Sequence, residues 1–399
     1  MSNAESANVA VIVSAARTAV GTANKGTLVD VEPKDLASHV VKAAVERSGI
    51  DPAAVDDIVL GEALYGGGVT ARYAAVEAGL VNAPGIALNR HCATGLTALS
   101  TAAGSIMAGM DRVVVAGGVQ SSSLGPRFSR RVAGTADDIQ PWFPFSHPEQ
   151  PDAPSMDMSI TVGWNAAVKG GLTRADQDEW AFRSHQRAIA GIDSGAFVEE
   201  IVPLEVKRRD GTTVTFEVDE HPRRETTLDK LASLKPLHPE IEGFSITAGN
   251  ASGVNDGAAA LVLAEASTAK ELGATPLAII KSWASVGVDP ADTGLAPPAA
   301  ILRALDRANL KIGDVDLIEV NEAFASVAVN AARELKLDEA IVNPLGSGCS
   351  IGHPIAMTGA RMVMSLVYEL RRRGGGIGVA SMCAGGGMGS ALVFEVPAP

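Results

Sequence analysis

The chain has 399 residues, 46% of them hydrophobic and 20% charged, which is typical of a folded protein of two or three domain-sized units. Acidic residues outnumber basic ones by 46 to 33, and the formal net charge of −13 argues against a general nucleic-acid binder. Three scattered cysteines are too few for a disulfide framework or a zinc cage, so we expect no metal site and a cytoplasmic location. We also expect no signal peptide and no membrane span.

Two parts of the chain share one pattern of elements. Residues 38–60 and 299–320 each predict an amphipathic helix, a short break with Val-Asp, and a strand. Residues 89–120 and 343–387 each begin with Asn and continue through a Gly-containing turn into a helix and a strand. This alternation favours an α/β protein with mainly parallel strands. The recurrence in the same order indicates two duplicated α/β halves, with chance similarity as the alternative.

The stretch between the halves, about 121–250, has a different character. It contains a proline-rich, aromatic segment, then a predicted helix over 174–194 that Thr173 would cap. A basic run at 207–209 leads into Asp210-Gly211 between two β-like runs, which predicts a hairpin. We expect this insert to lie over the double core as a cap or lid.

Two cysteines stand in segments that suit chemistry. Cys92 lies at the start of a predicted helix, where the helix N-terminus would favour the thiolate and lower the pKa. Cys383 follows an apolar strand and precedes three glycines, Gly385 among them, which allow backbone N–H groups to approach a ligand. The alternatives are a packed core cysteine at 92 and a plain turn after 383. Cys349 has no comparable setting, and we interpret it as a packing residue.

Polar residues in two further turns complete a candidate site. His353 lies between Gly352 and Pro354 before a predicted helix. It could act as a general base, or it could be an ordinary exposed turn histidine. Asn321 follows a predicted strand and could orient a water or donate to an oxyanion, or cap a helix. The Gly-rich stretch at 249–257 matches no nucleotide-binding pattern. Two cysteines, a histidine and an asparagine in such turns suit covalent acyl transfer through a thioester.

Eight blocks covering essentially the whole chain resemble the thiolase family. They are SAARTAVG (14–21), NRHCATGL (89–96), AGGVQS (116–121), TAGNASGVNDGAAA (247–260), SWASVGVDP (282–290), NEAFA (321–325), GHPIAMTGAR (352–361) and CAGGGMG (383–389). The resemblance implies a duplicated α-β-α-β-α core of two five-stranded halves with an inserted loop domain. The implied divisions are 1–120 for the first part of the N-terminal half, 121–250 for a CoA-covering loop domain, 251–275 for the end of that half, and 276–399 for the C-terminal half.

The resemblance also implies roles for the candidate residues. Cys92 matches the nucleophile that takes up the acyl group, and His353 matches the base that activates it and helps bind the thioester oxygen. Asn321 matches the residue that holds a water in that oxyanion site, and Cys383 matches the acid/base at the acetyl-CoA carbon. The backbone N–H groups of Cys92 and Gly385 match the second oxyanion hole.

Contacts to the substrate's CoA portion are implied in the same way. Ser252 matches a contact to the pantetheine arm, and Arg223, or its neighbour Arg224, matches a cation near the adenine end. Local basic residues such as those at 207–209 could attract CoA despite the overall negative charge. The resemblance therefore implies CoA and acetyl-CoA as substrates, no tightly bound cofactor, no nucleic-acid or membrane partner, and a homodimer or homotetramer.

The implied reaction is reversible thiolytic cleavage of a 3-oxoacyl-CoA to acetyl-CoA and a shortened acyl-CoA, or the reverse Claisen condensation. Two alternatives are an irreversible ketosynthase-like condensing enzyme and a non-catalytic acyl-CoA-binding protein on the same fold. A second cysteine in CAGGGMG favours the thiolase interpretation over the ketosynthase one.

The chain departs from the family pattern at several positions near the expected substrate surfaces. They are a short segment around Tyr65–Arg72, Gln120 for an acidic residue, Met158–Asn165, Gly346–Cys349 for Gly-Gly-Ala, and Ala356 and Thr358 for smaller residues. We therefore expect an acyl pocket unlike that of a plain acetoacetyl-CoA enzyme. Aromatic residues that could line it are Trp142, Phe143, Phe145 and Trp164.

Overall fold

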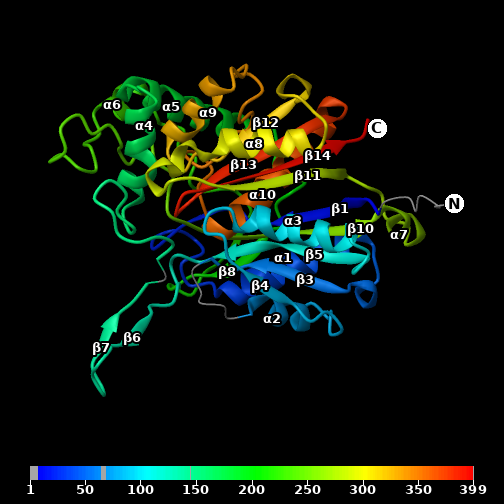
Figure 1. The fold of residues 1–399 in the computed structure, drawn as a ribbon. Helices are drawn as coiled ribbons and strands as arrows, with labels where there is room; N and C mark the ends of the chain where they lie inside the picture. Colours follow the sequence, from blue (N-terminus) through cyan, green and yellow to red (C-terminus); the bar gives the residue numbers. More distant parts are fainter. Residues whose placement is uncertain (1–7, 64–68, 144, 399) are drawn as a thin grey trace.

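A single mixed sheet of ten strands runs through the computed structural model, which describes residues 8–63, 69–143 and 145–398 (Figure 1). Within these residues the order is β12-β13-β14-β11-β1-β10-β5-β3-β4, with β2 paired to β10. The strands are β1 (Ala10–Arg17), β2 (Gly21–Thr22), β3 (Asp57–Gly61), β4 (Ile86–Leu88), β5 (Val113–Gln120), β10 (Asn255–Glu265), β11 (Ala278–Gly287), β12 (Leu317–Val320), β13 (Gly376–Ala384) and β14 (Met388–Val396).

The strand order confirms the duplication. The order β4-β3-β5-β10-β1 in the first half is mirrored by β12-β13-β14-β11 in the second, and β1 meets β11 where the halves join. The counterpart of β4 is reduced to one parallel bridge between Ile318 and Val342, so the second half has four strands among the described residues rather than five. The prediction of mainly parallel strands is wrong, because β10 and β14 run antiparallel to their neighbours. The tight glycine turn between β13 and β14 leaves no room for a helical crossover.

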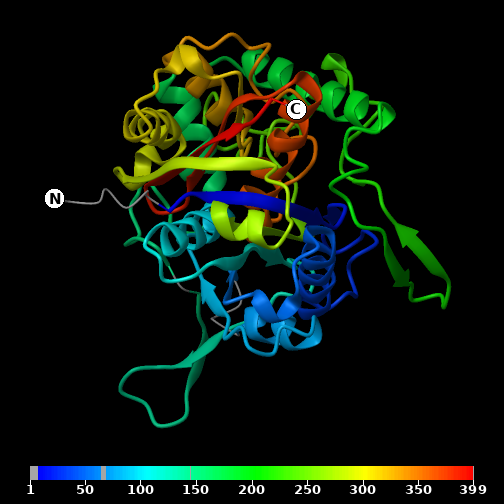
Figure 2. The ribbon, with the colours of Figure 1, turned by 90° about the vertical axis from the view of Figure 1, so that its right-hand side faces the viewer.

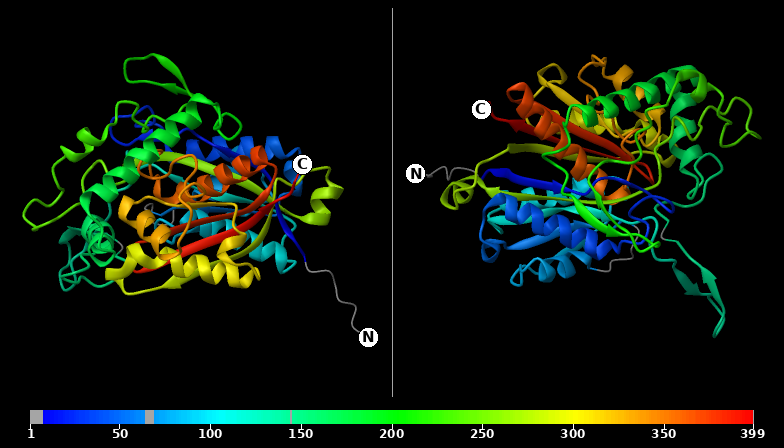
Figure 3. Two further views of the ribbon diagram at one scale, coloured as in Figure 1. Left: turned by 90° about the horizontal axis from the view of Figure 1, so that it is seen from above. Right: turned by 180° about the vertical axis from the view of Figure 1, so that it is seen from behind.

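Helices form layers on both faces of the folded sheet (Figures 1 and 3). Two central helices, α3 (Thr94–Met107) and α10 (Ile355–Arg373), lie against each other and against strands of both halves. The outer layers are α1 (Pro33–Ser48) with α2 (Thr70–Glu77) on the first half, and α8 (Ala296–Arg307) on the second. A Cβ on Gly95 would lie 2.7 Å from the Ala360 nitrogen, so glycine is what lets the central helices approach so closely.

The insert between β5 and β10 carries its own helices and two hairpins. Helix α5 begins as expected, with Thr173 and Asp176 forming a capping box, and the hairpin predicted across Asp210-Gly211 is confirmed. Both hairpins project from the body of the molecule (Figure 2). The elements are β6 (Ser129–Arg131), β7 (Ile139–Pro141), a π-helical turn (Ser159–Trp164), α4 (Asn165–Lys169), α5 (Arg174–Asp193), β8 (Leu204–Lys207), β9 (Thr213–Phe216) and α6 (Leu228–Ala232).

Among the described residues no helix is both long and apolar enough to cross a membrane, and no cluster of three potential metal ligands occurs. Residues 1–7, which include most of the segment before the first strand, and 64–68, where the chain looks short, lie outside the described residues.

Candidate active site

Four turns of the two halves bring the candidate residues together. Cys92 lies two residues before α3, and His353 lies two residues before α10. Asn321 follows β12 directly, and Cys383 is the penultimate residue of β13. Cys383 is close enough to Cys92 for that group to affect its pKa, Asn321 lies beside His353, and Cys92 shares a cavity with Ile355, two residues after His353. Strand ends are where α/β proteins collect polar groups.

Cys92 is half-buried at the wall of a small cavity that Gly385 also lines. Backbone hydrogen bonding from Gly385 and from Cys92 itself favours the thiolate, but burial has the larger effect and raises the pKa of Cys92 to about 11. The expectation of a lowered pKa is therefore wrong, because desolvation outweighs the donors at the helix start. At neutral pH the group is a thiol that needs a base to activate it.

The hydrogen bonds of His353 define which ring nitrogen is free. Its Nδ1 lies 2.7 Å from the Thr358 hydroxyl, which donates to the Pro354 carbonyl at 3.1 Å and so accepts from Nδ1–H. Its Nε2 is buried and has no partner among the described residues, so it can accept a proton. Burial, followed by the charge of Arg361, lowers the pKa of His353 to about 3, and the imidazole is neutral at pH 7.

Asn321 lies buried beside this imidazole. Its backbone N–H donates to the Ser381 carbonyl at 2.9 Å, which fixes it between β12 and β13. Its side-chain Nδ2 lies 3.5 Å from Nδ1 of His353, which is a contact and not a hydrogen bond because both nitrogens carry protons in this tautomer, and its Oδ1 has no partner among the described residues. An amide held in this way can position a water or a substrate oxygen next to His353.

Cys383 is buried at the end of β13, and burial followed by the nearby Cys92 raises its pKa. It pairs with Gly389 across the turn to β14. Gly386 and Gly387 in that turn have φ values of 89° and 76°, which favour glycine. The turn thus carries the Gly385 N–H back toward Cys92.

The two residues matched to CoA contacts lie in different places. Ser252 is half-buried and donates its backbone N–H to Ala323 at 2.9 Å, two residues from Asn321. Arg223 is exposed and lines a separate cavity of about 390 Å³ with Arg224, which is paired to Asp193. The structure therefore brings Ser252, but not Arg223, next to the reactive groups.

The cavity beside Cys92 has a volume of about 160 Å³. Phe143 and Phe145 line it, as the sequence suggested. Trp142 and Trp164 do not line it: Trp142 packs edge-on against Phe128, and Trp164 packs against Phe244. Because Trp142 and Phe143 are adjacent in the sequence, the sequence could not show which of the two side chains lines the cavity. The lining residues are His91, Cys92, Phe143, Phe145, Ser146, Ser155, Met156, Met158, Ile355 and Gly385.

Comparisons with known proteins agree with this architecture. Residues 10–267 match the thiolase N-terminal domain and residues 274–396 match the thiolase C-terminal domain. An acetyl-CoA acetyltransferase of Cupriavidus necator is 42% identical over 96% of this chain and 98% of its own. The chain belongs to the thiolase family. Thiolase-type acyl transfer is its chemistry, and neither the ketosynthase-like nor the non-catalytic alternative is favoured.

Solved thiolase structures show the same fold. A Bacillus anthracis acetyl-CoA acetyltransferase has a TM-score of 0.90 and 40% identity, covering 98% of this chain and 100% of the other. A human mitochondrial 3-ketoacyl-CoA thiolase in complex with CoA has a TM-score of 0.89 and 35% identity, covering 98% of both chains.

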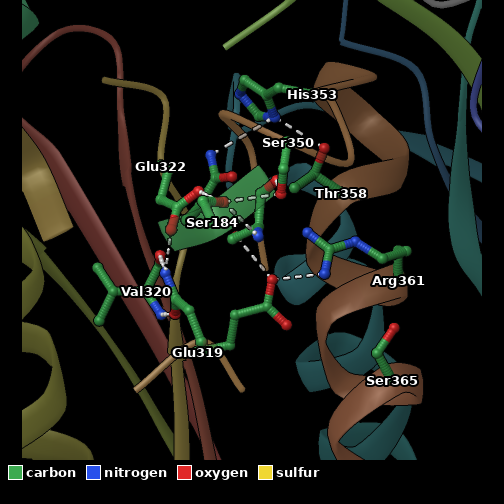
Figure 4. A network of polar contacts seen from close by, with 12 residues as sticks. Ser184, Glu319, Val320, Glu322, Ser350, His353, Thr358, Arg361 and Ser365 are labelled. Carbon is green, nitrogen blue, oxygen red and sulfur yellow. Dashed lines mark hydrogen bonds and ion pairs between the residues drawn. The ribbon is translucent and has the colours of Figure 1, made fainter. Parts of the chain in front are cut away.

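A buried carboxylate of this thiolase, Glu322, was not singled out from the sequence. It accepts hydrogen bonds from Trp180 Nε1 at 2.9 Å, Ser184 Oγ at 2.6 Å, Asn343 Nδ2 at 2.8 Å and the Cys349 N–H at 3.1 Å (Figure 4). Burial raises its pKa, and these donors oppose that effect. The only signal in the sequence was its place beside Asn321, directly after a predicted strand.

Ser347, which belongs to a departure from the family pattern, and the nearby Ser350 are part of the same network. Ser350 Oγ lies 2.7 Å from Ser184 Oγ, and Ser347 Oγ donates to Glu319 at 2.6 Å. Glu319 is in turn paired with Arg361 of α10, as Figure 4 shows. The departure at Ser347 thus supplies a hydroxyl to the buried carboxylate of Glu319, whereas Ser350 contacts Ser184, which donates to Glu322.

Cys349 is buried and serves as a packing residue, as its sequence setting suggested. Its Sγ lies 3.6 Å from the carbonyl oxygens of Asn250 and Glu322, and burial raises its pKa.

Proposed function

We propose that this thiolase catalyses the reversible thiolytic cleavage of a 3-oxoacyl-CoA through an acyl-Cys92 intermediate. The observation that carries the proposal is the buried Nε2 of His353, which has no partner among the described residues, in a neutral ring whose Nδ1–H donates to Thr358. Such a nitrogen is a base without competing partners. The neighbouring Asn321 and Cys383 supply the other groups that the reaction requires.

The first half-reaction transfers the acyl group to the enzyme. His353 Nε2 takes the Cys92 proton while the sulfur attacks the ketone carbon, and the backbone N–H groups of Cys92 and Gly385 stabilise the oxyanion. The bond between the α and β carbons breaks, its electron pair goes to the acetyl-CoA enolate, and the Cys383 thiol protonates that carbon. Asn321 and its water, with His353, stabilise the enolate oxygen. The imidazolium proton then passes to the Cys383 thiolate.

The second half-reaction returns the acyl group to CoA. His353 takes the proton of the CoA thiol, which attacks the acyl-Cys92 carbonyl, and Cys92 leaves and recovers that proton. Because the first product departs before CoA attacks, the kinetics are ping-pong. The condensation direction is the same path reversed.

CoA acts as a substrate in this proposal and not as a tightly bound cofactor. Ser252 contacts the pantetheine arm, and Arg223 lies near the adenine end. Lys25, Lys207 and Arg208 line an open cavity of about 530 Å³ and outnumber the acidic residues Asp210 and Glu220 there. Arg209 and Asp30 of the same cavity are already paired with each other. The CoA complex of the human mitochondrial relative supports this class of substrate.

Assembly into a homodimer or homotetramer, a cytoplasmic location and a role in fatty acid metabolism complete the proposal. Strand β4 lies at the edge of the sheet, its first residue Ile86 is 47% exposed, and Val81 before it is 61% exposed. An apolar edge strand is a ready template for pairing with a second copy. Light scattering after size-exclusion chromatography would measure the mass of the assembly.

The test of the reaction is cleavage of acetoacetyl-CoA with free CoA, followed by intact mass after brief exposure to acetyl-CoA. We expect turnover and an acetyl adduct for the wild type, neither for Cys92→Ser, and both for Cys349→Ala. The absence of turnover and of any adduct with acetoacetyl-CoA and with longer or ring-bearing 3-oxoacyl-CoAs would overturn the proposal and favour a non-catalytic acyl-CoA-binding role.

A further inference from the structure

The cavity beside Cys92 is larger than an acetyl group needs. Its volume of about 160 Å³ is close to that of an apolar cavity of about 150 Å³ that stays dry and binds benzene. A two-carbon acyl group on the Cys92 sulfur would leave most of this space to water. An acyl group of about six to eight carbons would fill it.

The walls of the cavity are apolar where the acyl group would lie. Phe143 and Phe145 come from the insert, with ring centroids 6.2 Å apart, and Met156 and Met158 follow in the same segment. Ile355 closes the wall at the start of α10. Aromatic and thioether side chains adapt to chains and rings and contact them by dispersion.

The polar groups of the cavity do not provide a site for a charged acyl end. No Lys, Arg, Asp or Glu lines it among the described residues. The one imidazole of that lining, His91, is neutral at pH 7, because burial and then His147 lower its pKa. The Ser155 hydroxyl is already bonded to Glu149 at 2.5 Å. The other side-chain hydroxyl of the lining, on Ser146, lies 3.4 Å from Nδ1 of His147 and is uncharged, so a terminal carboxylate would be desolvated without a charged partner.

The cavity opens onto an apolar rim. Phe145 is 54% exposed and Met156 is 60% exposed, and both also line the interior. Single exposed apolar residues are ordinary, but these two continue the wall of a pocket that begins at the nucleophile. An acyl group that reaches the rim would cover both side chains.

We propose that the preferred substrates of this thiolase are 3-oxoacyl-CoAs that deliver an uncharged, apolar acyl group of about six to eight carbons to Cys92. This inference rests on the proposed function and names its substrate class. Straight-chain and phenyl-bearing groups share the required chemistry, and dicarboxylic acyl groups are excluded.

The experiment measures kcat/KM for thiolysis of acetoacetyl-CoA, 3-oxooctanoyl-CoA, 3-oxo-4-phenylbutanoyl-CoA and 3-oxosuberyl-CoA. We expect 3-oxooctanoyl-CoA, the phenyl substrate or both to exceed acetoacetyl-CoA by about tenfold or more, since each buried methylene in an apolar pocket adds discrimination. The comparison of 3-oxooctanoyl-CoA with the phenyl substrate shows whether the cavity prefers a straight chain or an aromatic ring. The suberyl substrate has the same eight-carbon chain as 3-oxooctanoyl-CoA but ends in a carboxylate, and its kcat/KM is expected to fall well below that of 3-oxooctanoyl-CoA.

Two variants connect the preference to the cavity. Met156→Trp fills the rim and is expected to reduce the octanoyl-to-acetoacetyl ratio at least about fivefold, and Phe143→Ala is expected to shift the preference to longer chains. Trp164→Phe, outside the cavity, is the matched control and keeps the wild-type ratio. Met156 is largely exposed, so its replacement tests the idea even if Phe143→Ala does not fold.

The outcomes separate this inference from the proposed function. Turnover of acetoacetyl-CoA at least as good as that of every larger substrate, or ratios that Met156→Trp leaves unchanged, would overturn the substrate class and leave the thiolase reaction standing. A lack of turnover and of any acyl adduct with all substrates would overturn both.

Discussion

Cys92 and His353 occupy equivalent positions in the two halves of the molecule, because each lies two residues before one of the two central helices. The duplication therefore provides one helix start for the proposed nucleophile and one for its proposed base. The close approach of the helices at Gly95 holds the two starts in one rigid unit. The two halves therefore differ in function at one structural position, which is a cysteine in the first half and a histidine in the second.

The pKa of Cys92 predicts how its reactivity varies with pH. Burial holds this pKa at about 11, so the thiolate fraction of the free enzyme rises about tenfold for each pH unit between 7 and 10. We expect the rate of iodoacetamide labelling at Cys92, followed by intact mass, to rise throughout this range. A plateau below pH 8 would show that the thiolate is already formed at neutral pH and would contradict the argument.

The contact between Thr358 and His353 predicts a difference between two replacements. Thr358→Ser keeps the hydroxyl that accepts from Nδ1–H, whereas Thr358→Val keeps the shape and removes that hydroxyl. We expect kcat/KM to fall about tenfold or more for the valine variant and to stay near the wild type for serine. Nitrogen NMR of the imidazole would show a mixture of tautomers in the valine variant alone. Equal tautomer populations in both variants would contradict a positioning role.

Replacing Cys383 is expected to separate the two half-reactions. In Cys383→Ala the thiol that protonates the acetyl-CoA carbon is absent, so cleavage of acetoacetyl-CoA falls by about a hundredfold or more. Acetyl transfer from acetyl-CoA to Cys92 involves no proton transfer at a carbon atom, so we expect it to continue in this variant. Intact mass after acetyl-CoA, beside the cleavage rate, checks both. Equal losses in the two measurements would argue that Cys383 supports the fold of the site instead.

Glu322 predicts a large effect on stability from a small chemical change. Glu322→Gln replaces one acceptor oxygen by an NH₂ group that faces N–H and O–H donors, so buried donors lose their partners. We expect the free energy of unfolding to fall by about 1–3 kcal/mol. Glu334→Gln, on the exposed end of α9 (Ala325–Glu334), is the control and stays within about 0.5 kcal/mol. Denaturant unfolding measures both, and equal values would refute the network's importance.

His238 links the loop before β10 to the segment that carries Met158. Its Nε2 lies 2.9 Å from Asp157 and its Nδ1 lies 2.7 Å from Glu240, and the Glu240 hydrogen bond is the largest cause of its raised pKa. A raised pKa contributes stability below the unfolded value of about 6.5, and this contribution is lost as pH rises through the folded value. We expect the Tm difference between the wild type and His238→Gln to be larger at pH 5.5 than at pH 8.5. A difference that grows with pH would contradict this ion-pair argument.

The sequence allowed the duplication and the placing of four candidate residues in turns of the two halves to be predicted, because periodicity and strand-end polarity are local signals. That these turns share one site was implied only by the family resemblance. It could not predict that β1 pairs with β11, since nothing local marks one strand as the partner of another. It gave the wrong direction for the pKa of Cys92, because the depth of burial depends on the whole fold. The donors to Glu322 come from Trp180, Ser184 and residues near 343–349, which only the folded chain brings together.

The position of β1 has a consequence for how the chain folds during synthesis. Its partners on the two sides are β10, at 255–265, and β11, at 278–287, so this fully buried strand leaves the ribosome long before either neighbour exists. At roughly 5–20 residues per second, the apolar segment AVIVSAAR waits about 10–50 s for its first partner. The strand at the centre of the finished sheet is thus made first and paired late, and until β10 and β11 exist its apolar side chains lack the neighbouring strands that cover them.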